Sequence, residues 1–464
     1  MLGYVRGAGQ ANPEVLMKAE SLVNIGYQRL LAFQRPDGGF DWWGRDPGLT
    51  FLTAYAVQEF HDMGKVYEID PNVLEKAKNF LFSVQEKDGS WVRAGATHGL
   101  RIERMPALAL TTYVAWSVLE TGLKDARLEK ALEWLRAHAK EAGDDDYVLA
   151  LLANAFTARD RESAEAKAAL EALAARAKRD GDTVFWAVKG QTMVCGSGSS
   201  GDIETTALAA HALIRGGRNS ELASKALAFL VKSRGGNGAW GSTQATILAL
   251  KAILLASASQ GEMKSNAEIT VEVNGVKRHV IVTPDNWDVM QILDFKDAAK
   301  KGDNEVVIRY GGEVNLSYQV VGRYFVPWSK LPREERKEAV ELGVEYDRTS
   351  LTTRDVVRAT AKMRYNGPTA TFMVIVTLGL PPGFVADPGD FAEMIGMKKI
   401  QRYDLNPRQA TLYIGDVQPG QEFEFVYHLT PKYPIKAKTA RSAAYEYYNP
   451  DRKAVVEPRE IEVK

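Results

Sequence analysis

The chain is poor in cysteine and carries no excess of either charge. Cys195 is its only cysteine in 464 residues, so the chain forms no internal disulfide. Lysine plus arginine and aspartate plus glutamate number 59 each, which gives a net charge of zero. This balance argues against a nucleic acid as partner. Apolar runs stay below the roughly 18 residues that span a bilayer, and the N-terminal residues lack the pattern of a secretory signal.

A short phrase recurs in the first half of the sequence. Each copy has a polar residue, an Asp-Gly or Asn-Gly turn, an aromatic residue and then a Thr/Ala-rich apolar stretch. Copies begin at Gln34, Gln85 and Gly235, and a more divergent one begins at Asp180. A unit that cannot bury its own apolar face implies stacking of neighbours, so we predict helical hairpins that close into a ring. The aromatic residues expected to anchor the turns in the core are Phe40, Trp42, Trp43, Trp91 and Trp240.

Helical periodicity supports this ring. Apolar residues recur at three- and four-residue spacing over 14–33, 73–84, 128–139 and 162–177, which predicts helices there. Ten to twelve helices of this kind, as an order of magnitude, are enough for about six hairpins. The predicted α/α toroid occupies residues 1–262.

The pattern changes to β-structure near Ser265. Residues 268–282 alternate around Asn274-Gly275, a strong hairpin signal, and residues 306–321 form a second predicted hairpin. We predict that 263–330 is part of a β module whose other strands precede this chain.

A second β-sandwich is predicted for residues 331–464, because short alternating segments are separated there by turn signals. The fold class is therefore a multidomain chain, α and then β: an α/α toroid followed by two antiparallel β-sandwich modules. The predicted strands cover 356–365, 370–380, 409–414, 421–429 and 438–448, and a short helix covers 390–397.

Several phrases resemble the alpha-macroglobulin and complement family. Asn24–Leu31 with its following turn, and Gly241–Thr246, are similar to that family's thioester-containing domain. Gly379–Phe384, Ile400–Leu405 and Ala444–Asn449 are similar to its receptor-binding sandwich. The resemblance implies the order α/α toroid, second half of a CUB-like module, and macroglobulin sandwich.

One departure concerns the reactive motif of that family. Its Gly-Cys-Gly/Leu-Glu-Gln run, whose Cys and Gln side chains join as a thioester, is absent from this sequence. Cys195 has neither its position nor a following Glu-Gln. We therefore expect the chain to be a fragment of a longer, bacterial protein, with the thioester upstream of Met1.

The resemblance also implies roles for particular side chains. A histidine in the loop after the second Asp-Gly turn, here His98, would take the acyl group from the thioester and pass it to a hydroxyl. Tyr403, Tyr445 and Tyr447 match the aromatic residues that shield the thioester from water. Alternation along a strand would place Tyr445 and Tyr447 on one face and Tyr448 on the other. The alternatives are that His98 is a solvated loop residue and that the tyrosines simply pack within the sandwich.

Other apparent motifs carry no chemistry in this interpretation. The run Gly196–Gly201 spells a dinucleotide fingerprint without a preceding strand, and we expect a flexible loop. Cys195 has no local partner for catalysis and is expected to be idle. His61, His138 and His211 are too far apart in sequence to predict a metal site, and no metal or cofactor is expected. The run Asp144–Asp146 is expected to cap a helix.

The resulting hypothesis is the C-terminal part of an extracellular or periplasmic endopeptidase inhibitor that traps proteases, rather than an enzyme. Its expected partners are proteases, together with an intramolecular contact between toroid and C-terminal sandwich. A thioester-free adhesion or scaffold protein is the first alternative. A toroid enzyme of the terpene cyclase or prenyltransferase type is the second, and the two β modules after the toroid argue against it.

Overall fold

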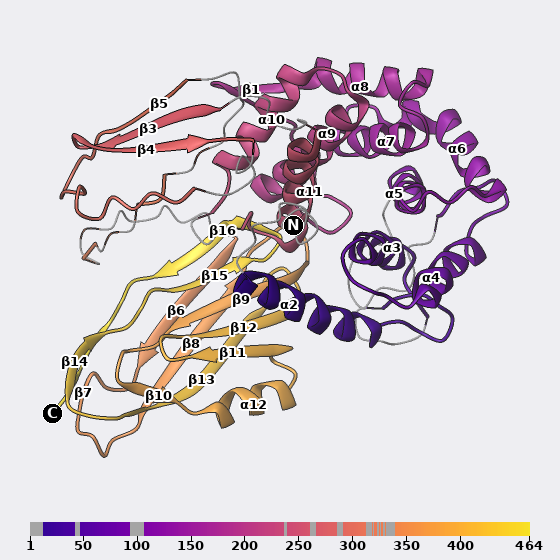
Figure 1. The fold of residues 1–464 in the computed structure, drawn as a ribbon. Coiled ribbons are helices and arrows are strands. Elements are labelled where there is room, and N and C mark those ends of the chain that lie inside the picture. Colours follow the sequence, from indigo (N-terminus) through magenta and orange to yellow (C-terminus); the bar gives the residue numbers. More distant parts are fainter. Residues whose placement is uncertain are drawn as a thin grey trace.

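The computed structural model describes residues 13–41, 47–92, 106–235, 239–259, 266–284, 291–311 and 339–464, with a few single positions between 318 and 330. Helices make up the first part of the chain, and antiparallel sheets make up the remainder (Figure 1). This order confirms the predicted fold class.

Two layers of helices form the first part. Each inner helix packs against the next inner helix along the chain, and each inner helix before the last also packs against the outer helix that follows it in sequence. The inner helices are α3 (Thr50–Gly64), α5 (Ala107–Leu119), α7 (Asp146–Arg159), α9 (Gly198–Gly216) and α11 (Thr243–Ser259). The outer helices are α4 (Pro71–Ser83), α6 (Ala126–His138), α8 (Ala164–Arg176) and α10 (Ser220–Lys232), and α2 (Pro13–Leu31) precedes both layers. The ring closes where Lys251 of α11 pairs with Asp62 of α3, at 2.9 Å.

The sequence determines which layer a helix joins. Every residue of α5 from Leu108 to Leu119 is buried, as expected of a helix that is apolar all round. The outer helix α6 buries one stripe only, made by Leu128, Ala131, Leu132 and Leu135. Helices predicted from periodicity at 14–33, 73–84, 128–139 and 162–177 are confirmed as α2, α4, α6 and α8, with ends that differ by up to two residues.

The recurring phrase has one recurring geometry. In four copies the backbone N–H of the aromatic residue donates to the hydroxyl of a threonine in the next inner helix, at 2.8–3.0 Å. In three copies the indole N–H donates to a carbonyl at the end of the preceding outer helix. These aromatic residues, all buried, are Phe40, Trp91, Trp186 and Trp240. The predicted anchoring role is confirmed for Phe40, Trp91 and Trp240, and Trp186 has the same role without having been predicted. Trp42 and Trp43 lie outside the described residues.

Glycine is required in the turns of this phrase. Gly38 and Gly89 have φ of +92° and +95°, and a Cβ at either position would lie 2.5–2.6 Å from a backbone carbonyl of the neighbouring helix. The glutamines before the turns close them: the side-chain amide of Gln85 donates to the carbonyls of Gly89 and Arg127, at 2.8 and 3.0 Å. Each turn is thereby tied to the next outer helix.

A three-stranded antiparallel sheet in the order β4-β3-β5 follows the ring. Its strands are β3 (Ala267–Val273), β4 (Val276–Val282) and β5 (Val306–Gly311). The hairpin predicted at Asn274-Gly275 is confirmed. The second predicted hairpin extends beyond Gly311 into residues 312–317, which lie outside the described ranges, so only its first strand, β5, is observed.

The C-terminal part is a sandwich of a four-stranded sheet, in the order β10-β13-β8-β6, and a five-stranded sheet, in the order β11-β12-β9-β15-β16. A small sheet, β14-β17-β7, lies beside them. The bounds are β6 (Val340–Tyr346), β7 (Ser350–Leu351), β8 (Val357–Tyr365), β9 (Thr371–Gly379), β10 (Phe384–Ala386), α12 (Pro388–Gly396), β11 (Arg402–Asn406), β12 (Gln409–Val417), β13 (Glu422–Pro431), β14 (Ile435–Lys438), β15 (Ser442–Glu446), β16 (Asn449–Val456) and β17 (Glu460–Val463).

Two local predictions are wrong. The strand predicted at 438–448 is divided, because β14 and β15 join different sheets and β15 ends at Glu446. The glycine-rich run Gly196–Gly201 is not a loop throughout, because its last four residues form the first turn of α9. By contrast, the predicted helix cap is confirmed: the carboxylate of Asp145 accepts from the backbone N–H groups of Tyr147 and Val148.

Candidate functional site

The C-terminal sandwich touches the helical ring at the start of α9. The backbone N–H of Ser197 donates to the carbonyl oxygen of Tyr448 at 3.0 Å. The backbone N–H of Ser199 donates to Oδ2 of Asp451 at 3.2 Å. Tyr448 lies in the turn between β15 and β16, and Asp451 is on β16, which packs against α9 (Figure 1).

A second contact lies at the start of α11. The hydroxyl of Tyr447 is 3.1 Å from the hydroxyl of Thr243, and either can donate. Beside it is a cleft of about 290 Å³, lined by residues of both domains: Gly241, Tyr445, Tyr447, Pro450 and Lys453. The N-terminal ends of two adjacent inner helices thus meet one hairpin of the sandwich.

Glycines allow this close approach. Gly198 has φ of +56°, and a Cβ there would lie 2.9 Å from Oδ1 of Asn449 and 3.1 Å from Oδ2 of Asp451. A Cβ on Gly201 would lie 2.5 Å from a methyl group of Val188. The glycine-rich run therefore serves packing against the sandwich and the ring rather than phosphate binding.

A buried carboxyl group lies one turn further along α9. Glu204 has no solvent exposure. Its Oε1 accepts from the hydroxyl of Ser242 at 3.2 Å, while its Oε2 has no hydrogen-bond partner. Burial raises the pKa of Glu204 to about 7, although hydrogen bonds from Thr192 and Ser242 oppose the shift. The group therefore titrates near neutral pH inside the ring.

The single cysteine is close to this carboxyl group. Burial, and then the charge of Glu204, raise the pKa of the Cys195 thiol to about 12. A nucleophilic cysteine needs the opposite, a positive local field that lowers the pKa of the thiol. Cys195 is thus a poor nucleophile, in agreement with its expected idle role.

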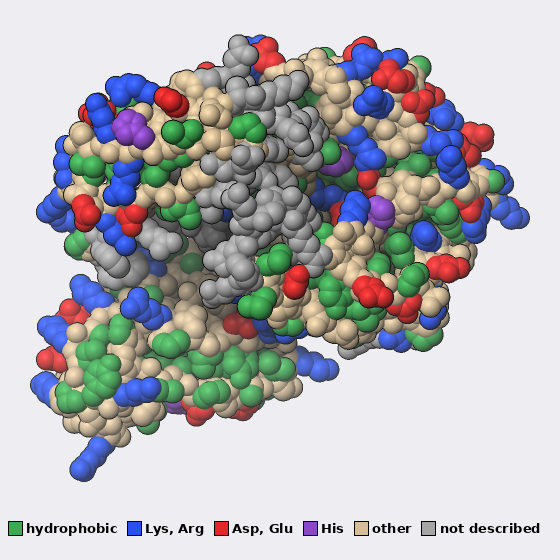
Figure 2. All heavy atoms as spheres, in the orientation of Figure 1, with side chains coloured by type: hydrophobic (Ala, Val, Ile, Leu, Met, Phe, Trp, Pro, Cys, Tyr) green, Lys and Arg blue, Asp and Glu red, His purple; other side chains and the backbone are tan. Residues whose placement is uncertain are grey.

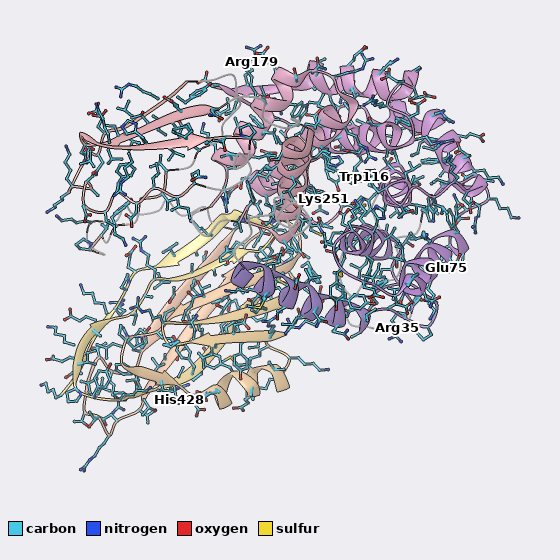
Figure 3. The ribbon with its side chains drawn as sticks, viewed as in Figure 1. Arg35, Glu75, Trp116, Arg179, Lys251 and His428 are labelled. Carbon is cyan, nitrogen blue, oxygen red and sulfur yellow. The ribbon has the colours of Figure 1, made fainter. Side chains whose placement is uncertain are left out.

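Charges in the C-terminal part of α9 are paired instead. Arg215 forms an ion pair with Glu120 of α5, which also accepts from the indole N–H of Trp116 at 2.7 Å. Lys251 of α11 lies between Asp62 and the side-chain oxygen of Gln58 (2.9 and 3.2 Å). Figure 3 shows Trp116 and Lys251 together in the middle of the ring. Inner helices are here cross-linked by ion pairs.

The histidines named above serve the fold. Nδ1 of His211 is 2.7 Å from Oδ1 of Asn154, and burial, with a smaller effect of Lys251, lowers the pKa of His211 to about 4. His138 stacks on Trp134, with ring centroids 3.9 Å apart. Within the part of the chain that the structure describes, no three His, Cys, Asp or Glu side chains lie close enough to hold a metal ion.

Two sequence models of known domains match the chain. One, described as the A-macroglobulin TED domain, matches residues 1–255, and the other, described as the A-macroglobulin receptor binding domain, matches residues 369–458. The first match alone covers more than half of the chain. The chain belongs to the alpha-macroglobulin family.

Relatives of this alpha-macroglobulin chain include a thioester-containing protein and ovostatin. It is 23% identical to thioester-containing protein 1 allele R1 of Anopheles gambiae, over 98% of this chain and 33% of that protein. It is 23% identical to ovostatin of Gallus gallus, over 98% of this chain and 32% of that protein. The chain thus spans about a third of the length of these relatives.

A solved structure shows the same fold. Native alpha-2-macroglobulin of Escherichia coli, from domain MG7 to the C-terminus, superposes with a TM-score of 0.62 and 14% identity, over 97% of this chain and 68% of that chain. At this identity the likeness concerns the fold alone. No helix among the described residues of this family member is long and apolar enough to cross a membrane.

The predicted site residues are only partly brought together. Tyr445 and Tyr447 line the cleft at the ring, whereas His98 lies outside the described residues. Tyr403 is half-buried on the edge strand β11. Its ring centroid is 5.4 Å from that of Phe391 in α12, and its hydroxyl donates to the carbonyl of Pro388 at 3.5 Å. The structure thus gives Tyr403 a packing role within its own domain.

Tyr448 was placed wrongly by strand alternation. Because β15 ends at Glu446, Tyr447 and Tyr448 lie in a turn, with ring centroids 4.8 Å apart, and both contact the ring. The sequence interpretation also missed Asp451 and Glu204. Glu204 is the only Asp, Glu, Lys or Arg in residues 203–214, which was a usable signal for a buried acid, whereas nothing local distinguished Asp451.

Proposed function

We propose that this chain is the thioester-domain and receptor-binding region of a protease trap, acting within a longer alpha-macroglobulin. The proposed domains are the toroid at 1–262, the partial CUB-like module at 263–330 and the receptor-binding sandwich at 331–464. One observation carries the proposal: a domain of the TED type is joined to a receptor-binding sandwich that docks on one end of its inner helices.

The docked end suits a reactive acyl group that must be kept from water. A thioester hydrolyses once water reaches it, so a covering domain preserves it until the two domains separate. Tyr445 and Tyr447 are the proposed shielding residues, since they line the cleft between the domains. Cys195 is not proposed as the thioester cysteine, because no Glu-Gln follows it and its thiol has a raised pKa.

His98 remains the proposed acyl-transfer residue. A neutral imidazole attacks the thioester carbonyl, the thiolate leaves, and the acyl-imidazole then passes the acyl group to a hydroxyl. This route favours hydroxyl acceptors over amines. The proposed partners are therefore proteases with accessible hydroxyl groups, met outside the cytoplasm in the extracellular or periplasmic space of a bacterium.

Surface charge supports protein partners rather than a polyanion. On the face shown in Figure 2, lysine and arginine side chains are interspersed with aspartate and glutamate over the helical ring. Such a mixed surface gives little counterion release on a phosphate backbone.

The test uses the longer protein that contains this chain. We expect incubation with a protease to yield a covalent conjugate, visible as a band of higher mass under denaturing conditions, and methylamine pretreatment to abolish it. His98→Ala should lose transfer to glycerol while keeping transfer to methylamine, with His61→Ala on α3 as the matched control. Absence of any conjugate from the unmodified protein would remove the trap from consideration, and unchanged glycerol transfer in His98→Ala would remove the histidine.

A further inference from the structure

The backbone N–H groups in the first turn of α9 do not find their hydrogen-bond partner in the usual place, the side chain of the helix's own N-cap residue. In helices α4, α6, α7, α8 and α12, the side chain of the N-cap residue accepts a hydrogen bond from a backbone N–H of the first turn. The N-cap residue of α9, Ser197, makes no such bond although serine is a favoured cap. Its hydroxyl is directed instead to the carbonyl of Tyr448, at 3.5 Å.

The sandwich supplies what α9 lacks. Oδ2 of Asp451 accepts from Ser199, the second residue of the helix, which is the N–H that a cap side chain ordinarily satisfies. The carbonyl oxygen of Tyr448 accepts a hydrogen bond from the N–H of Ser197. A carboxylate at this position also meets the positive end of the helix dipole. A residue more than 250 positions away in sequence therefore completes the helix.

The backbone is shaped for this cap. Gly198 adopts φ of +56°, and any side chain on it would press against Asn449 and Asp451. Gly217, at the other end of α9, has φ of +64° with nothing within 4 Å of an added Cβ. Both glycines have a positive φ, but only Gly198 also lies against the sandwich.

We propose that Asp451, a residue of the sandwich, acts as the N-cap of α9, and that this contact is a releasable latch that holds the two domains together. The inference rests on the proposed function, in which separation of the domains exposes the covered end.

The latch is built to be weak. Its hydrogen bonds join only Ser197 and Ser199 to Tyr448 and Asp451 among the described residues. Asp202 opposes the contact with a like charge: burial, and to a smaller extent Asp451, raise the pKa of Asp202. The carboxylate of Asp202 accepts a hydrogen bond from the N–H of Val188 at 2.8 Å. Moving Asp202 away from Asp451 would break this bond. A contact of this kind releases under a modest pull from the rest of the protein.

Cys195 reports release of the latch. Cys195 comes two residues before Ser197, whose N–H donates to the carbonyl of Tyr448 at 3.0 Å, and the thiol also interacts electrostatically with Tyr448. The test therefore measures the rate at which a maleimide modifies Cys195 in the native 464-residue chain, for Asp451→Ala and Gly198→Ala. We expect each variant to react about fivefold faster than the unmodified chain, the factor that corresponds to loss of a cap worth about 1 kcal/mol.

Matched controls separate the latch from general destabilisation. Asp145→Ala removes an ordinary cap from α7, and Gly217→Ala imposes the same φ strain away from the sandwich; both should lower the melting temperature and leave the Cys195 rate unchanged. Equal rates in Asp451→Ala and Asp145→Ala, or in Gly198→Ala and Gly217→Ala, would overturn the latch. Because no protease, thioester or acceptor is used, the outcome is independent of whether the longer protein traps anything.

Discussion

The two ends of α9 handle buried charge in opposite ways. Near its start, Glu204 is fully buried with hydroxyl groups as partners and one oxygen unbonded. Near its end, Arg215 is paired with Glu120, and the adjacent Lys251 is paired with Asp62. One end is therefore easily perturbed and carries the sandwich, while the other is a cross-linked structural end. In this fold, the unpaired carboxyl group lies on the side of the ring that the sandwich contacts.

Cys195 offers the largest contrast with an ordinary thiol. A pKa of about 12 instead of 9.0 lowers its thiolate fraction about 1,000-fold at pH 8, and the greater nucleophilicity of a basic thiolate restores about 20- to 30-fold. We expect maleimide or iodoacetamide to modify the native chain about 30- to 60-fold more slowly than the urea-unfolded chain. Equal rates in the two states would mean that the start of α9 is open to solvent.

Glu204→Gln should stabilise the protein at high pH. The pKa of Glu204 is raised above the value of 4.5 of an exposed glutamate. The protein therefore loses stability progressively as pH rises from about 4.5 to 7, because the buried carboxyl group becomes charged. The charged carboxylate of Glu204 costs about 3 kcal/mol of stability above pH 7. The buried amide of the glutamine that replaces it lacks some hydrogen-bond partners and costs about 1 kcal/mol. We expect a gain of about 2 kcal/mol at pH 8 in urea unfolding and none at pH 4.5. An unchanged pH profile would show that Glu204 is solvated.

The same substitution at the other end should have the opposite sign. Although burial acts against it, the ion pair with Arg215 lowers the pKa of Glu120, so the carboxylate contributes stability above pH 4.5 that is lost as pH falls. Glu120→Gln should cost about 1 to 2 kcal/mol at pH 8, because Arg215 is left without its partner. A stabilising effect would remove the distinction between the two ends.

Lys251→Met should have the smallest effect. Burial disfavours the charge of Asp62, but Lys251 and then Lys65 outweigh it and lower the pKa of Asp62 to about 2. Asp62 thus adds stability above pH 3.8 that is lost as pH falls towards 2. Methionine keeps the packing on Trp116 and loses the ion pair, at a cost of about 1 kcal/mol for a half-exposed pair. Lys65→Met, at the exposed side of Asp62, is the control and should change stability less.

The ring itself was predictable because its determinants are local. Helix periodicity, the Asp-Gly turns and the buried Phe40 and Trp91 all lie within one repeat, so the sequence pattern predicts them directly. The hairpin at Asn274-Gly275 is local in the same sense. The contact between Ser199 and Asp451 is not, because it depends on how two domains meet. Tyr448 was assigned to the wrong face for a related reason, since the end of β15 at Glu446 is set by pairing within its sheet.

Hydrogen exchange at the start of α9 tests most directly whether the sandwich closes this end of the ring. The N–H groups of Ser197 and Ser199 bond to Tyr448 and Asp451, whereas the side chain of Asn219 caps none of the first N–H groups of α10. We predict that the amides of Ser197 and Ser199 exchange at least about tenfold more slowly than those of Ser220 and Glu221, because exchange requires the domains to part. Exchange of all four amides at the same fast rate would contradict the docked arrangement.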